Sequence, residues 1–145
     1  MRFVMFMIPK VYQPDTPEKA GEGFTPPADA VEAMMEYNEE LAKAGALIAL
    51  DGLHPPQDGA RVEFTGKKPV VTDGPFVESK EVVGGYWIID VPSKEKAIEW
   101  ARRCPAADGD VIEIRPVFEM EEFPEDVRKY VDNAVVNEQL KAQKR

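Results

Sequence analysis

His54, the one histidine of the chain, is the residue best suited to proton transfer, and Asp73 is its candidate acidic partner. Both follow apolar runs and stand at turns: His54 precedes two prolines, and Asp73 begins an Asp-Gly-Pro sequence. A histidine, with a reference pKa of ~6.5, exchanges protons near neutral pH, and an adjacent carboxylate orients its ring and stabilises the imidazolium. The pair therefore predicts acid/base chemistry on a small polar or aromatic molecule. The alternative is that each side chain only stabilises its own turn.

Charged and aromatic side chains further along the chain are candidates for binding such a molecule. Arg115 can hold a substrate carboxylate through two parallel hydrogen bonds, and Glu113 lies two residues earlier on the same strand face. Lys80 would add positive charge, and Tyr86 or Trp87 would supply an apolar wall. The alternatives are a solvent-exposed pair for Glu113 and Arg115, a solvated turn for Lys80 and core packing for the two aromatic residues.

Motifs that the sequence lacks narrow the class of reaction. It has no serine nucleophile motif, no cluster of metal-ligating residues at the usual spacing and no phosphate-binding glycine loop. A lyase or an isomerase therefore fits better than a hydrolase, and no cofactor or metal follows from the sequence. The competing hypothesis is a dimer that binds a small effector or a protein partner without catalysis.

Length and composition are those of one globular domain. The 145 residues are 43% hydrophobic and 31% charged, and no apolar run approaches the ~18 residues of a membrane span. The net charge of −9 disfavours direct contact with nucleic acid. The lone cysteine, Cys104, excludes an internal disulfide and indicates a reducing compartment, so we expect a cytoplasmic protein. Residues 1–8 are too short an apolar run for a signal peptide and are typical of a strand.

The spacing of apolar residues predicts strands alternating with helices. The single domain, residues 1–145, would have a core of about 1–119 and a C-terminal helical extension of about 124–143. Residues 10–27, with four prolines, are expected to form a long loop. The expected strands are 1–8, 46–53, 61–64, 69–72, 86–91 and 111–119, and the expected helices are 29–44 and the segment between Ser93 and Pro105.

The helix expected at 29–44 carries a methionine-rich apolar face. We expect Asp29 to cap its N-terminus and Gly45 to end it. Core packing is the favoured role of this face, although a methionine-rich stripe also suits the wall of a ligand pocket. The face consists of Val31, Met34, Met35, Asn38, Leu41 and Ala42.

These elements predict an α+β fold of the ferredoxin-like type, with an antiparallel sheet and both helices on one of its faces. Strands 1–8 and 86–91 are apolar on both faces, so the face without helices needs a cover as well. A second copy of the chain is the simplest cover, which predicts a homodimer formed through the open face of the sheet.

An ordered series of short motifs runs from the middle of the chain toward its C-terminus. The motifs are Leu53-His54-Pro55, Val71-Thr72-Asp73-Gly74-Pro75-Phe76, Glu78, Lys80, Glu81, Gly84-Gly85-Tyr86 and Ile112-Glu113-Ile114-Arg115-Pro116-Val117. This series resembles the YCII-related domain family, specifically its DGPF-motif subgroup, and the similarity extends to about Glu119. The resemblance implies a dimeric α+β barrel and an enzyme with a histidine and an aspartate in its cleft, here His54 and Asp73. Some relatives are fused to or associated with extracytoplasmic sigma factors, so a regulatory role stays open.

Overall fold

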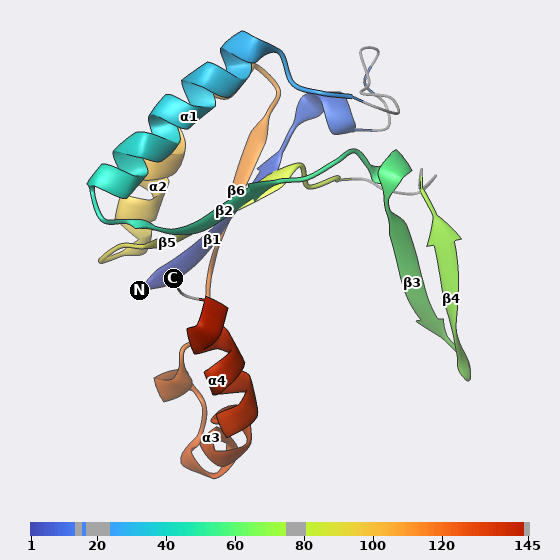
Figure 1. Ribbon diagram of the computed structural model, residues 1–145, viewed down its shortest axis with the longest axis vertical. Coiled ribbons are helices and arrows are strands. Elements are labelled where there is room, and N and C mark those ends of the chain that lie inside the picture. Colours follow the sequence, from blue (N-terminus) through green and yellow to red (C-terminus); the bar gives the residue numbers. More distant parts are fainter. Residues whose placement is uncertain (14–15, 17–23, 75–80, 144–145) are drawn as a thin grey trace.

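A four-stranded antiparallel sheet forms the centre of the computed structural model, which describes residues 1–13, 16, 24–74 and 81–143. Its strands are β1 Arg2–Ile8, β2 Leu47–Gly52, β5 Gly85–Asp90 and β6 Val111–Pro116. Two helices connect them, α1 Ala28–Lys43 and α2 Lys94–Arg102. The strand order is β2-β5-β1-β6, and both helices lie on the same side of the sheet (Figure 1). The predicted α+β fold with an antiparallel sheet and helices on one face is confirmed.

The core lies between the sheet and these two helices. The helices contribute Tyr37, Leu41 and Ala97, and the sheet contributes side chains from alternate positions of the central strands β1 and β5, because successive side chains of a strand point to opposite faces. The positions between them, such as Val4 and its cross-strand partner Ile88, point to the open face, which carries neither α1 nor α2. The buried residues of the core are Phe3, Met5, Met7, Tyr37, Leu41, Ala46, Trp87, Ile89, Val91 and Ala97.

A separate hairpin is inserted between β2 and β5, as the sequence predicts. It consists of β3 Ala60–Thr65 and β4 Lys68–Asp73, with Gly66 at a φ of 63° in the turn. The hairpin projects away from the main sheet (Figure 1), and every residue of both strands is exposed. Its two strands pair with each other in a sheet of their own.

The ends of the helices follow local sequence signals, with one correction. Gly45 follows α1 at a φ of 70°, and the Ser93 side chain accepts a hydrogen bond from Lys96 N at 3.2 Å, so both predicted signals are confirmed. The prediction that Asp29 caps α1 is wrong. Pro27 is the N-cap residue and Asp29 lies in the first turn, because proline already supplies the extended backbone that precedes a helix.

The buried face of α1 is also rotated from the expected one. Asn38 and Leu41 are buried as predicted, but Val31 and Met35 are 44% and 57% exposed. Tyr37 is buried in their place, and its hydroxyl donates a hydrogen bond to Trp100 O at 2.7 Å. The reason is that α1 packs near β2, an edge strand, so part of the helix overhangs the sheet.

The C-terminal extension is two helices rather than the predicted one. They are α3 Glu125–Val131 and α4 Ala134–Gln143, after a short 3-10 turn at Met120–Glu122. Asp132 leaves the helical conformation, and Asn133 Oδ1 then accepts a hydrogen bond from Val136 N at 3.1 Å. The break therefore comes from an Asp-Asn pair that caps the second helix.

The start of the expected 10–27 loop is docked on the fold. Lys10–Tyr12 form a 3-10 turn, and Tyr12 is buried with its hydroxyl donating to Leu53 O at 2.8 Å. Its ring meets Phe24 edge-on at a centroid distance of 5.9 Å. Residues 14–15 and 17–23 of this loop lie outside the described residues. Of the helices that the structure describes, none is long and apolar enough to cross a membrane.

The Ser93 cap gives a direct test of helix-end energetics. We expect Ser93→Ala to lower the free energy of unfolding by about 1 kcal/mol, because the Lys96 amide loses its side-chain acceptor. Urea denaturation measures the change. Lys94→Ala is the control, since Lys94 is an exposed residue that begins the same helix and caps no backbone amide, and an equal loss in both variants would contradict the role of the Ser93 cap.

Candidate functional site

His54 stands just beyond the end of β2, in a turn that holds it against an acidic residue. Leu53 N donates to Gly84 O at 2.9 Å, which fixes the entry to the turn, and Pro55 is fully buried. Two prolines restrict the backbone here, and a 3-10 turn follows at Pro56–Asp58. The turn brings Asp58 Oδ2 to 3.0 Å from His54 Nδ1. The His54 side chain is otherwise 81% exposed.

Asp73 reaches the same turn through its backbone. It ends β4 opposite Ala60, and the next residue, Gly74, donates its N–H to Gly59 O at 2.9 Å. A Cβ atom on Gly74 would lie 1.7 Å from the Pro56 carbonyl oxygen, so only glycine allows this approach of the two chains. The two turns that carry His54 and Asp73 therefore meet. In the described part of the chain, however, the acidic partner of His54 is Asp58.

A hollow of about 230 Å³ opens beside His54. Arg61 enters it from the first strand of the hairpin, and Glu81 enters it from the segment that leads to β5. A small molecule in this hollow would meet the imidazole together with one positive and one negative side chain. The described residues contain no group of three His, Cys or acidic side chains that could hold a metal ion. The hollow is lined by Leu53, His54, Pro56, Arg61, Glu81, Val82 and Val83.

Tyr86 and Trp87 point to opposite faces of the sheet. Tyr86 lies on the open face, where its hydroxyl donates a hydrogen bond to Asp51 Oδ2 at 2.6 Å, and this bond raises the pKa of Tyr86. Trp87 is 5% exposed and lies in the core beneath the helices. Its indole N–H donates to Asn38 Oδ1 at 2.8 Å. Of these two aromatic residues, only Tyr86 therefore lies on the open face.

Glu113 and Arg115 share the open face, as their spacing predicts. Glu113 lies opposite Phe6 of the central strand β1, and Arg115 lies two residues further along β6. Strands β6 and β2 are the two edges of the sheet, so three strand spacings of about 4.8 Å separate them. Within a single chain, Arg115 is therefore not among the residues that line the hollow beside His54. Lys80 lies outside the described residues.

The YCII-related domain family matches residues 1–121, from the first strand to the 3-10 turn before α3. The chain belongs to this family. The match covers His54, its partner Asp58 and the Asp73 turn, while the helices α3 and α4 lie beyond the matched segment of this YCII-related protein.

An uncharacterised protein of Rhizobium meliloti (strain 1021) is a relative of this YCII-related protein. The two are 32% identical over 80 residues, which are 54% of this chain and 64% of the relative. The matched segment thus spans less than two thirds of the length of that curated relative.

Asp58 is the site residue that the sequence analysis missed. Its signal is the spacing of four residues from His54 across two prolines, which is the spacing at which one helical turn brings side chains together. The sequence predicts Asp73 as the acidic partner of His54 instead, because the Asp-Gly-Pro turn is the more distinctive pattern. The structure shows that the neighbouring Gly74 has a packing role of its own.

The close approach at Gly74 predicts a clear stability effect. Gly74→Ala should lower the free energy of unfolding by about 1–3 kcal/mol, because the new methyl group meets a backbone oxygen that cannot rotate away. Gly52→Ala is the matched control, since a Cβ atom there has no neighbour within 4 Å. Denaturant titration compares the two. Equal stability of the two variants would show that Gly74 does not pack against Pro56.

Proposed function

We propose that this YCII-related protein is a small-molecule enzyme of the lyase or isomerase type in which His54 transfers the proton. The contact of 3.0 Å between His54 Nδ1 and Asp58 Oδ2 carries the proposal. With Asp58 ionised, Nδ1 is the protonated nitrogen, and Nε2 is left with the lone pair that a base needs. His54 Nε2 would take a proton from a carbon next to a substrate carbonyl and return it to another atom.

The surroundings of His54 support a polar substrate. Arg61 and Glu81 line the hollow, so a carboxylate or hydroxyl group on the substrate has complementary charges beside the imidazole. Asp73, whose turn is hydrogen-bonded to the same segment, is retained as a second acidic candidate. Lys80 is retained from the sequence as a candidate for substrate binding.

Proton transfer is tested without knowing the physiological substrate. A panel of small enolisable keto acids and ketones is incubated with the protein in D₂O, and loss of the carbon-bound proton signal is followed by NMR. We expect wild type to accelerate exchange of at least one compound, and His54→Ala to reduce that rate by about 10²- to 10⁴-fold because the base is removed. Asp58→Asn should also reduce the rate.

The control variant for this assay is Asp108→Asn, an exposed aspartate on the loop before β6. It should exchange protons at the wild-type rate. If Asp73→Asn slows exchange and Asp58→Asn does not, the orienting role passes to Asp73. Exchange that survives His54→Ala unchanged would end the proposal.

A binding or regulatory role without catalysis is the second candidate, and the exposure of His54 favours it. An imidazole that is 81% exposed is not shielded from water, as proton abstraction from carbon usually requires. This role predicts ligands that raise the melting temperature of wild type while no compound exchanges its protons. Such ligands would still lose affinity in His54→Ala if the hollow binds them.

The open face of the sheet supports a homodimer that would shield the site. Val4 and Ile88 face each other on this face, and the helices cover the opposite one. Glu113 and Arg115 lie on the same face, so packing it on a second copy would bring them into the interior of a barrel. Buried charges need a counter-charge or a ligand there, which suits a role for them, with Tyr86, in holding a polar substrate.

The hairpin β3–β4 also supports association. An isolated two-stranded hairpin is marginal in water. The register places Val62 opposite Val71 on one face, with Phe64 and Pro69 beside them. Phe64 is 83% exposed and Val71 is 65% exposed, so the described residues of a single chain leave this apolar face uncovered.

A charge on the open face tests the dimer. We expect wild type to have the mass of a dimer by light scattering at micromolar concentration, and Ile88→Lys to shift it to monomer because an ammonium group would be buried at the interface. Val135→Lys on α4, a position that is 78% exposed, is the control and should stay dimeric. A monomeric wild type would contradict the dimer.

Three further assignments belong to the same proposal. The Asp-Gly-Pro-Phe sequence at residues 73–76 supports membership of the DGPF-motif subgroup. We take residues 1–145 as one domain whose C-terminal helices are an extension. A cytoplasmic location fits the lone thiol: Cys104 is partly buried, and burial raises its pKa to about 11, so it suits packing better than redox chemistry.

A further inference from the structure

Asn38 is the one buried polar side chain of the described core. It lies on α1, is 6% exposed, and faces the edge of the sheet at β2. A buried amide normally has all its hydrogen-bonding atoms paired, because leaving a donor or acceptor without a partner costs stability. The hydrogen-bond partners of Asn38 Oδ1 and of its NH₂ group therefore decide whether this buried amide is fully paired.

Trp87 fixes the orientation of the Asn38 amide. The indole N–H of Trp87 can only donate, and it lies 2.8 Å from Asn38 Oδ1 in a buried hydrogen bond. The oxygen of the amide must therefore point to Trp87, since the reverse orientation would set two donors against each other. The NH₂ group is consequently aimed away from the core tryptophan.

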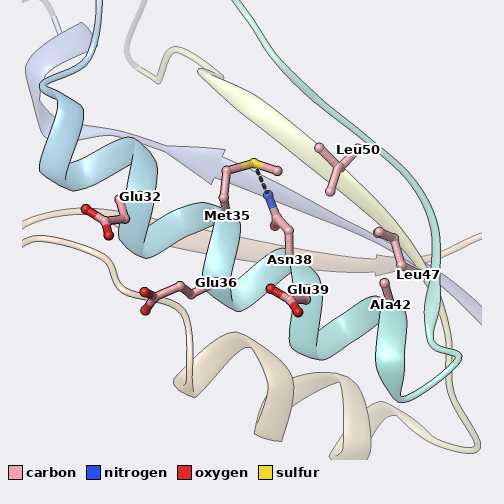
Figure 2. A pocket seen from close by; sticks show the side chains of 8 residues that line it. All are labelled: Glu32, Met35, Glu36, Asn38, Glu39, Ala42, Leu47 and Leu50. Atoms are coloured by element: carbon pink, nitrogen blue, oxygen red, sulfur yellow. Dashed lines mark hydrogen bonds between the residues drawn. The ribbon is translucent and has the colours of Figure 1, made fainter.

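That NH₂ group has only a poor acceptor. Asn38 Nδ2 lies 3.5 Å from Met35 Sδ, and a thioether sulfur accepts hydrogen bonds weakly (Figure 2). Among the described residues, no oxygen atom accepts a hydrogen bond from it. Met35 is 57% exposed and has a flexible side chain, so it can leave this position at little cost.

Asn38 and Met35, the sulfur of which the NH₂ group meets, lie beside two adjoining hollows between α1 and the β2 edge. One has a volume of about 370 Å³ and is lined mainly by apolar side chains, including Met34, Leu50 and Trp87. The other is a more open groove of about 600 Å³ whose rim carries Glu32, Glu36 and Glu39. Asn38, Met35 and Leu50 line both.

We propose that this space binds a largely apolar, neutral or cationic small molecule through a carbonyl oxygen that accepts a hydrogen bond from Asn38 Nδ2. The ligand replaces the Met35 sulfur as acceptor, and its apolar body lies against Met34 and Leu50. The glutamates on the rim disfavour anions by charge repulsion. The site shares no lining residue with the hollow beside His54.

The probe for this site is prodan, a neutral naphthalene dye that carries one ketone and becomes brighter and bluer in apolar surroundings. The matched probe is the analogue in which a propyl group replaces the propionyl group, 2-propyl-6-dimethylaminonaphthalene, which keeps the carbon skeleton and lacks only the carbonyl oxygen. We expect wild type to bind prodan saturably and about fivefold to tenfold more tightly than the analogue, which is the effect of one buried hydrogen bond.

Asn38→Leu removes the donor and keeps a side chain of similar size. In this variant we expect the two probes to bind with Kd values equal to within about twofold. The ratio of the two Kd values is the deciding readout, because a general loss of packing would weaken both probes alike. The proposal would be overturned if the ratio in Asn38→Leu equalled that of wild type, or if the two probes bound wild type with equal Kd values.

A second variant keeps the test valid if Asn38→Leu does not fold. Val31→Trp fills the mouth of the apolar hollow at a position that is 44% exposed, so it should fold and lose prodan binding. Val135→Trp on α4 is its control and should bind prodan as wild type does. Saturable prodan binding that survives Val31→Trp would place the dye elsewhere and overturn the site.

Discussion

The hydrogen bond from Gly74 N to Gly59 O is the contact on which the candidate site depends. It closes the base of the hairpin against the proline turn, at a separation that leaves no space for a side chain on Gly74. This closure holds the segment in which His54 and Asp58 face each other. The Asp73-Gly74 pair is thus explained first by backbone packing, and any chemistry of Asp73 is added to that role.

Local rules predicted most of the fold. Short apolar runs predicted the strands, and Gly45 and Ser93 marked helix ends that the structure confirms. The failures came where tertiary packing decides. The exposure of Met35 depends on α1 overhanging an edge strand, and the break between α3 and α4 depends on capping at Asn133. Neither follows from the spacing of apolar residues alone.

The sequence predicts the histidine of the candidate site, His54, but it does not predict Asp58 as the acidic partner. Asp58 is four residues from His54, but its side chain approaches only because two prolines set the turn between them. The interaction of Asn38 with Trp87 joins residues 49 apart in sequence, so no local pattern could reveal it. Sequence names the residues on a face, whereas the pairing of their polar atoms depends on how the elements pack.

The central claim is that Asp58 orients His54 so that Nε2 is free to act as a base. Because the chain has one histidine, ¹⁵N-histidine labelling gives the spectrum of His54 alone. At about pH 9, where an ordinary imidazole is neutral, we expect the tautomer protonated at Nδ1 in wild type and a shift toward the Nε2-protonated form in Asp58→Asn. A wild-type ring protonated mainly at Nε2, or a tautomer unaffected by Asp58→Asn, would contradict it.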